Sequence, residues 1–351
     1  MPSVTVPRRR QWPRRLLVAL VVVIVVAVIG ATVYHLDEVA LGPGEAVPVT
    51  GPHGLISVPA SRSHPVVGRI LLTTVSLSNV RAINWVFDKL NPNVALVPAS
   101  EVYGPLSSSQ FQQLDEAAMT LSQQTAAVVA LRELGYQVQE HQGAAVVEVE
   151  AGSPAAKAGV PLGSVIVAVD GQPVTSAAEV IAALEAHHPG DVVRLTIEQA
   201  AGGPPRTIPV TLAARPHHPK EGFVGIAVAN GPWFQLPFRV GVSSDNIGGP
   251  SAGLAFTLGI IDELSSGDLT GGRSVAATGV INLNGTVGDV GGVAQKTVAV
   301  RRAGASVFFV PVQEYRTAES KAGPNLRVVA VSNVDQALSV LEDLGGHKPG
   351  S

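Results

Sequence analysis

The sequence predicts an α+β protein with one N-terminal transmembrane helix, a small β unit built as a sandwich or barrel, and a C-terminal α+β unit. Three observations support this fold class. An uncharged apolar run lies near the start, short strands separated by glycine and proline turns begin near residue 135, and helices alternate with strands after residue 222. The 351 residues suffice for two or three domains of about 100–150 residues each.

The apolar run, residues 16–34, contains 19 residues and no charge. As a helix it would be about 28 Å long, close to the hydrocarbon thickness of a bilayer. Five arginines lie within the basic segment 1–15, and Asp37 and Glu38 follow the run. This asymmetry predicts a transmembrane signal anchor over residues 16–36, with a cytoplasmic N-terminus and the bulk of the chain outside the cell membrane. A cleavable signal peptide, whose apolar core is usually about 7–15 residues, is the alternative.

Composition excludes several kinds of site. The net charge of −3 provides no basic field for nucleic acid, and the absence of cysteine excludes disulfides and cysteine-based zinc sites. The adjacent histidine pairs 187–188 and 217–218 have no carboxylate at ligand spacing, so we predict no metal site. No G-x-x-x-x-G-K-[ST] motif is present, which argues against ATP binding. We therefore expect no cofactor.

Residues 37–130 are predicted to form a linker and an N-terminal extracytoplasmic region. The glycine- and proline-rich stretch 37–66 is interpreted as a juxtamembrane linker, followed by a strand over residues 69–77. Residues 107–134 carry serine caps and apolar residues at helical spacing, which predicts one or two helices. This region contains no motif that indicates a function.

The remaining chain divides into two units by its pattern of predicted strands and helices. Residues 131–214 carry short strands and one helix, which indicates the small β unit, and the composition of residues 215–222 is typical of a hinge. The C-terminal α+β unit is predicted over residues 222–342, with a flexible tail over residues 343–351.

The β unit contains the stretch "VEVEAGSPAAKAGVPLGSVIVAVDGQPV", residues 147–174. It predicts a glycine turn, one short helical turn opened by Ser-Pro, and a strand ending in an Asp-Gly turn. These residues resemble the PDZ domain of HtrA-type exported proteases. Ser164 departs from the pattern, because the family usually has aspartate there.

The PDZ resemblance implies capture of an extended peptide as an added strand, with its C-terminal carboxylate held by backbone N–H groups. By the resemblance, this peptide-binding loop would lie at Leu134, Gly135, Tyr136 and Gln137. The alternative is that Gly135 only ends the preceding helix.

A single serine, Ser251, lies in the run "GGPSAG" immediately before an apolar helix. The first N–H groups of a helix lack intrahelical partners, so they could stabilise an oxyanion that forms beside this hydroxyl. The small residues Gly248, Gly249, Ala252 and Gly253 leave room for the backbone of a bound peptide. The alternative is that Ser251 is a simple N-cap on a buried helix.

A base for this serine has few candidates. Residues 219–346 contain no histidine, which excludes a Ser-His-Asp triad inside the C-terminal unit, and Lys296 is its only lysine between residues 221 and 320. We place Lys296 in the first turn of a helix over residues 293–304, where the helix dipole opposes a cation. Its small apolar neighbours would also lower its pKa by desolvation, and a neutral amine can accept a proton from serine.

The stretches "GGPSAG", "TGVINLNGTVGDVGGVAQK" and "AVRRAGASVFFVP" together resemble the proteolytic domain of Lon proteases, the S16 family, over residues 222–342. The resemblance implies a dyad of Ser251 as nucleophile and Lys296 as general base, 45 positions apart, with Thr278 supporting the lysine. It also implies a ring of six copies.

One departure leaves the acidic group of this site open. The residues before "GPSAG" are "SSDNIG" in place of the Lys-Asp pattern of ATP-dependent members. Asp245 and Asp289 are the candidates for that acidic group.

Together these features resemble the bacterial membrane-anchored PDZ–Lon protease family. They predict an ATP-independent extracytoplasmic serine endopeptidase that cleaves unfolded or flexible exported proteins selected by its PDZ-like unit. The alternative is a non-catalytic, membrane-tethered PDZ scaffold that binds exported partners. Self-processing near residues 37–66 is a third interpretation.

Overall fold

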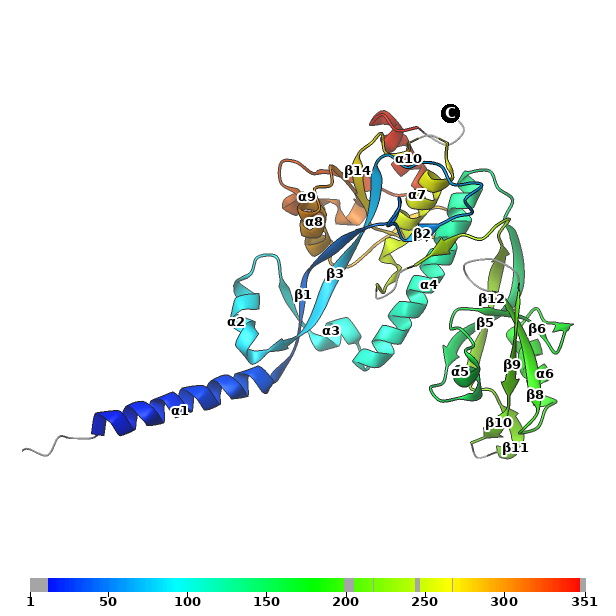
Figure 1. Cartoon of the computed structure of the whole chain (residues 1–351), viewed down its shortest axis with the longest axis horizontal. Coiled ribbons are helices and arrows are strands. Elements are labelled where there is room, and N and C mark those ends of the chain that lie inside the picture. The colour runs from blue at the N-terminus through cyan, green and yellow to red at the C-terminus, as the bar shows by residue number, and fades with distance from the viewer. Residues whose placement is uncertain (1–11, 199–204, 217, 244–246, 267, 348–351) are drawn as a thin grey trace, which may run out of the picture. The chain divides into compact units, whose positions relative to one another are not determined.

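The computed structural model describes residues 12–198, 205–216, 218–243, 247–266 and 268–347 (Figure 1). The chain divides into two compact units. Unit 1 comprises residues 1–43 and 75–105, and unit 2 comprises residues 44–74 and 106–351.

Unit 1 begins with the apolar helix that the sequence predicts. Helix α1 (Trp12–Val33) contains an 18-residue window, Leu16–Val33, with a mean hydropathy of 3.2. None of the residues in this window is buried inside the protein. By length and composition it can cross a membrane, as an anchor or as a signal sequence. The predicted span ends three residues later than α1, and most of the predicted basic segment, residues 1–11, lies outside the described residues.

The prediction of a linker over residues 37–66 is wrong for its first part. Strand β1 (His35–Pro48) pairs with β3 (Arg69–Arg81), which extends beyond the predicted strand. The glycines that suggested turns instead allow close approach between strands, since a Cβ at Gly44 would overlap the Thr74 side chain. The Glu45 N–H donates to Thr74 Oγ1 at 2.9 Å, which ties the two strands together at this point.

The other elements of unit 1 follow β3. They are α2 (Ala82–Leu90), β4 (Ala95–Pro98) and α3 (Ala99–Tyr103). Strand β4 pairs with β1 in antiparallel register, from Glu38 opposite Pro98 to Leu41 opposite Ala95. The first helical residue of α2, Ala82, donates its N–H to the Tyr34 carbonyl at 3.0 Å.

The central sheet has the strand order β18-β17-β14-β3-β1-β4. Parallel pairs join β3, β14, β17 and β18, because each of these strands is followed by helical crossovers or long connections. The new strands are β14 (Ser274–Ala277), β17 (Val307–Pro311) and β18 (Arg327–Val331).

Helices pack on this sheet around one main apolar core. All twelve residues of α7 (Gly253–Leu264) are buried, and α7 lies against α4 (Ser108–Glu133). Helix α4 is a single long helix whose first turn is closed by a capping box between Ser107 and Gln110. The remaining helices are α8 (Val293–Arg302), α9 (Tyr315–Ala322) and α10 (Val334–Asp343).

Short elements complete this part of unit 2. Strand β2 (Ile56–Ser57) pairs with β13 (Gly241–Val242), and β15 (Val280–Ile281) pairs with β16 (Val287–Gly288). The second pair forms a hairpin around the turn "NLNG", with Gly285 at a φ of 78°. Two short 3₁₀ helices are η1 (Pro250–Ala252) and η2 (Val312–Glu314).

The small β unit has its own sheet and its own core. Its strand order is β12-β5-β6-β8-β9, with β7 paired to β6, and its buried residues include Ile166, Leu195 and Ile197. The strands are β5 (Gln139–Val149), β6 (Val165–Val169), β7 (Gln172–Pro173), β8 (Val192–Glu198), β9 (Arg206–Thr211) and β12 (Ile226–Gln235). The helices are α5 (Pro154–Ala158) and α6 (Ala177–Glu185), the latter capped by Ser176.

Two predicted boundaries of the β unit differ in the structure. Where a hinge was predicted, β10 (Ala213–Arg215) and β11 (His218–Phe223) form a hairpin. Strand β12 then pairs with β5 from Ile226 to Gln235, so the sheet of the β unit continues past the predicted boundary at residue 222. Local composition hid this, because the partner strand of β12 lies far earlier in the chain.

The predicted flexible tail over residues 343–351 is ordered at its start. Gly346 donates its N–H to the Leu341 carbonyl, and His347 donates its N–H to the Asp268 carbonyl, both at 2.9 Å. Residues 348–351 lie outside the described residues.

Candidate active site

The structure brings Ser251 and Lys296 together. Lys296 Nζ lies 2.8 Å from Ser251 Oγ and 3.1 Å from Thr278 Oγ1. The serine comes from η1, the lysine from the first turn of α8, and the threonine from the end of β14. All three predicted residues therefore meet at one point within hydrogen-bonding distance.

The backbone of the serine is fixed by the residues around Thr278. The Ser251 carbonyl accepts the Thr278 hydroxyl at 3.1 Å and the Gly279 N–H at 2.9 Å. Thr278 is itself held by its N–H, which donates to the Phe309 carbonyl at 3.0 Å. The central sheet thus positions both the amine and the hydroxyl through one threonine.

Lys296 is only 3% exposed, and burial lowers its pKa from 10.5 to about 8. The charge of Glu314, on η2, acts in the opposite direction and raises this pKa. Sequence reasoning missed Glu314, because η2 reaches the site only through the packing of β17. A substantial fraction of the amine is neutral near pH 8, so it can act as a base.

Ser251 is not a simple N-cap. Gly249, at a φ of 84°, is the residue before η1, and neither η1 nor α7 has a side-chain cap. The positive φ at Gly249 turns the chain so that Pro250 and Ser251 enter the short helix. The serine hydroxyl is therefore left for the lysine amine.

The small residues around Ser251 make room for this chain itself rather than for a bound peptide. A Cβ on Gly253 would lie 2.8 Å from Ile281 Cγ2 and 2.9 Å from Ser122 Oγ. A Cβ on Gly248 would overlap the Asp115 carboxylate. At both positions the space is taken up by β15 and α4, which corrects the prediction.

Helix α4 holds the segment that carries Ser251. The Gly249 N–H donates to the Asp115 carbonyl at 3.1 Å, and the Ser122 hydroxyl donates to the Pro250 carbonyl at 2.9 Å. Asp115 and Ser122 are seven positions apart, so they lie on one face of α4. The sequence indicates the helix, but no local signal connects it to Ser251, which follows more than a hundred residues later.

The two aspartates predicted as the acidic group are not placed at the site by the described residues. Asp245 lies outside the described residues, and Asp289 is exposed. The structure instead places the Asp115 carboxylate against Gly248 and Gly249. Partial burial, and then the neighbouring Glu116, raise the pKa of Asp115. The acids near the dyad therefore come from α4 and η2.

Comparison with known families divides the chain in the same way. Residues 242–342 match the Lon protease (S16) C-terminal proteolytic domain. Residues 146–199 match a PDZ domain model. The chain contains a Lon-type proteolytic domain and a PDZ domain. Its serine and lysine occupy one site inside the Lon-type domain.

Curated relatives match one part of the chain each. Serine protease PepD of Mycobacterium tuberculosis is 46% identical over 82 residues, which is 22% of this chain and 18% of that protein. Lon protease of Chloroflexus aggregans is 33% identical over 94 residues, 26% of this chain and 11% of that protein. Lon protease of Rickettsia typhi is 34% identical over 93 residues, 26% of this chain and 12% of that protein. The chain thus spans less than a fifth of the length of these relatives.

Among solved structures, the PDZ domain of an SdrC-like protein from Listeria innocua is 26% identical. The match covers 24% of this chain and 92% of that one, with a TM-score of 0.22.

The four residues predicted to bind peptide do not lie on an open edge of the PDZ sheet. Leu134 ends α4, Gly135 follows it at a φ of 78°, and Gln137 is exposed. Tyr136 makes an edge-on ring contact with Phe238 at 5.2 Å, and Leu134 and Tyr136 pack against the core around α7. Gly135 follows the end of a helix, and peptide binding at these four residues stays a prediction. The open edges of the sheet are β12 and β9.

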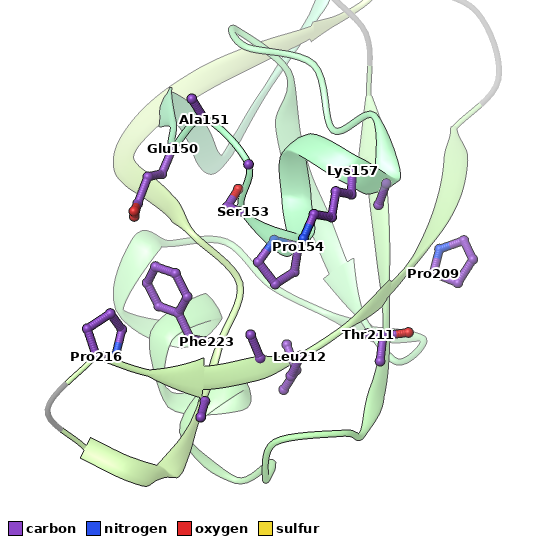
Figure 2. Close-up of a pocket in the computed structure, with 14 residues that line it drawn as sticks. Glu150, Ala151, Ser153, Pro154, Lys157, Pro209, Thr211, Leu212, Pro216 and Phe223 are labelled. Atoms are coloured by element: carbon purple, nitrogen blue, oxygen red, sulfur yellow. The ribbon is translucent and has the colours of Figure 1, made fainter.

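The PDZ domain also contains an open cavity of about 560 Å³. Figure 2 shows Pro154 and Lys157 of α5 and Phe223 of β11 around it. It is lined by residues from 150–158 and 209–223 and by none of the four residues at 134–137.

Proposed function

We propose that this protein is a membrane-anchored, ATP-independent serine endopeptidase that cleaves unfolded or flexible exported proteins with a Ser251–Lys296 dyad. The observation that carries the proposal is the 2.8 Å separation between the serine hydroxyl and a buried amine whose pKa is lowered to about 8. A lysine held only for structure has no need of a hydroxyl partner and a desolvated position.

The geometry supports a two-step mechanism. Ser251 Oγ attacks the scissile carbonyl carbon while the neutral Lys296 amine takes the hydroxyl proton, and the carbonyl oxygen becomes an oxyanion. The C–N bond then breaks, the leaving amine takes the proton from the Lys296 ammonium, and an acyl-enzyme remains. A water molecule gives a proton to the same amine and its oxygen attacks the ester carbon. The bond to Ser251 Oγ then breaks, and the Lys296 ammonium returns the proton to Oγ, so that both groups recover their starting states. Thr278 holds the amine in line throughout.

We assign the oxyanion to the backbone N–H groups that follow Pro250 in η1, since proline itself has no N–H. These groups precede the fully buried helix α7, whose N-terminal end favours negative charge. Preorganised donors of this kind contribute about 3–4 kcal/mol to transition-state stabilisation in other serine peptidases.

Two features support the choice of unfolded substrates. The 351 residues contain no G-x-x-x-x-G-K-[ST] motif that could hold ATP for unfolding. Without such a motor, a chain must already be flexible to lie extended against Ser251. The membrane helix α1, as an uncleaved anchor with a cytoplasmic N-terminus, would present the catalytic domain to exported proteins.

We propose that the PDZ domain recruits substrate segments at β12 rather than at residues 134–137. Strand β12 is an edge strand, and its first part, residues 226–231, contains no proline. The other edge, β9, has Pro209 in its middle, which has no N–H to donate to an added strand. When an unfolded substrate is added to the Ser251→Ala protein, we expect the amides of β12 to become protected from hydrogen exchange. Substrate binding that leaves the exchange of β12 amides unchanged contradicts this proposal.

A ring of six copies is the assembly expected from the Lon-type domain. Mass photometry of the full chain in nanodiscs or detergent tests it, with a sixfold mass as the expected result. A monomer that retains full activity contradicts it.

The direct test of the proposed function compares Ser251→Ala and Lys296→Ala with the parent on an unfolded protein substrate. Both variants are expected to lose at least about a thousandfold in kcat/KM. Lys220→Ala, which removes an exposed lysine of β11, is the matched control and should cleave as the parent does. Cleavage by either dyad variant at the parent rate contradicts the proposal.

A further inference from the structure

Helix α2 carries an apolar stripe of four residues, of which the first is half-buried and the other three are exposed. Ile83, Val86, Phe87 and Leu90 follow the spacing i, i+3, i+4, i+7, so they share one face of the helix. Val86 is 53% exposed, Phe87 74% and Leu90 77%, and no residue of α2 is buried. An amphipathic helix normally turns such a face toward a core, and α2 does not.

The opposite face of α2 is the one attached to the protein. Trp85 Nε1 donates to Glu38 Oε2 of β1 at 2.8 Å, and Lys89 Nζ lies 4.3 Å from the centroid of the Trp85 ring. The bond from Trp85 to Glu38 fixes the rotation of α2 about its own axis, and the Lys89 contact lies within α2. The apolar stripe is therefore held outward by specific interactions.

The position of α2 along the membrane helix is also fixed. The Ala82 N–H donates to the carbonyl of Tyr34, one residue after α1 ends, and α1 and α2 are in contact (Figure 1). A helix of nine residues is about 13 Å long. With α1 across a bilayer, the whole of α2 lies within that distance of the point where the chain leaves the hydrocarbon.

We propose that the stripe of Ile83, Val86, Phe87 and Leu90 is a membrane-interface surface that inserts into the outer lipid boundary beside α1. This inference rests on the membrane anchoring given under the proposed function. Interfacial helices bury their apolar face by about 5–10 Å at the headgroup boundary, with tryptophan, tyrosine and lysine nearby. Tyr34 and Lys89, both exposed, supply two of those residue types at this place.

A bilayer fits this surface better than a second copy of the chain. The bond between Ala82 and Tyr34 holds the stripe next to the membrane helix whatever the assembly, whereas a partner subunit would have to reach this depth beside α1. The consequence is a second membrane contact, which holds unit 1 at the bilayer surface.

The absence of cysteine makes the test direct, because one introduced thiol gives one label. Phe87→Cys and Leu90→Cys report on the stripe, and Asn84→Cys on the exposed polar face of α2 is the matched control. Each full-length variant is labelled with an environment-sensitive fluorophore in vesicles of phosphatidylethanolamine and phosphatidylglycerol. Quenching is measured with nitroxide lipids and with iodide in the water, and Val22→Cys in α1 reports separately on the anchor.

The expected result is several-fold stronger lipid quenching at positions 87 and 90 than at 84, greatest for nitroxides near the headgroups, with weak iodide quenching. Strong iodide quenching at 87 and 90 while position 22 is quenched by lipid overturns this inference and leaves the anchor intact. Shielding from both quenchers, with energy transfer between differently labelled copies, indicates a subunit contact and also overturns it. Loss of lipid quenching at position 22 removes the anchor and this inference together.

Discussion

At the scale of single residues, the proposed chemistry depends on the pKa and the hydrogen bonds of the Lys296 amine. Burial lowers its pKa to about 8, while Glu314 limits the fall. Ser251 and Thr278 supply two hydroxyl partners, so the buried amine remains hydrogen-bonded in either protonation state. The site therefore holds a base that titrates near physiological pH.

The pH dependence of kcat/KM should follow this amine. Because only the neutral form accepts the Ser251 proton, kcat/KM should rise about tenfold per pH unit below the pKa and level off above about pH 8. Glu314→Gln removes the charge that raises this pKa, so its profile should shift to lower pH. Initial rates on an unfolded substrate across the range measure both, and a flat profile for the parent contradicts the assignment.

Replacing the lysine should stabilise the fold while it abolishes activity. The folded pKa of about 8 lies below the ordinary 10.5, so the unfolded chain binds more protons between these values, and stability rises with pH across that window. Below it, the buried cation costs roughly 3 kcal/mol, partly offset by two hydrogen bonds of about 1 kcal/mol each. Lys296→Met should thus gain about 1 kcal/mol in urea unfolding at pH 7, and a clear loss relative to Lys220→Met contradicts this.

The pairing of Ser251 with Lys296 could be proposed from sequence because few residues there can serve as a base. Residues 221–320 contain no histidine and one lysine, which leaves Lys296 as the candidate base, and the resemblance to Lon proteases implies the roles of Ser251 and Thr278. Ser122, Asp115 and Glu314 could not be predicted, because nothing in their own neighbourhoods differs from a solvated helix or turn. Their roles come from tertiary packing.

At the scale of elements, α4 supports the segment that carries Ser251. Ser122→Ala removes the hydroxyl that donates to the Pro250 carbonyl, which frees the segment before Ser251. We expect kcat to fall about tenfold with KM nearly unchanged, because substrate contacts remain while the nucleophile loses its alignment. Gln113→Ala, an exposed position on the same helix, is the control, and equal kinetics for the two variants contradict the role of Ser122.

The far end of α7 holds a second buried titratable group. Asp262 is 1% exposed and accepts the Leu269 N–H, and burial raises its pKa to about 7, with further increases from Asp268 and Glu263. Because the folded pKa lies above the ordinary 3.8, its stabilising contribution is complete below pH 4 and is lost as pH rises through about 7. The free energy of unfolding should fall over this range in the parent and fall less in Asp262→Asn. Identical pH dependence of the two proteins contradicts the expectation.

Element by element, the sequence predicted helices better than strand partners. Helices α4, α6, α7 and α8 have caps or periodicity that can be seen locally. Strand β1 was hidden by glycines and prolines, and β12 by a partner strand some eighty residues earlier. Whether a segment forms a strand depends on the strands it pairs with, and a single sequence does not identify those partners.

At the scale of the whole molecule, the account combines three functions in one chain. A membrane helix and the stripe on α2 would hold it at a bilayer, a PDZ domain would recruit an extended segment, and a Lon-type domain would cut it. The proteolytic domain is completed by segments before and after the PDZ domain, since β3 and α4 precede it and α7 and α8 follow it. A fragment that begins after the PDZ domain should therefore not fold, which circular dichroism of residues 236–351 would test against the full chain. A native-like cooperative unfolding transition in that fragment contradicts this.

The central claim is that one sheltered amine activates one serine. The rate at which a peptidyl phosphonate forms an adduct, followed by intact mass and peptide mapping, tests it most directly. The account predicts a single adduct on Ser251, formed faster as pH rises toward about 8 and abolished in Lys296→Ala. An adduct that forms equally fast without the lysine, or that maps to a residue other than Ser251, would contradict it.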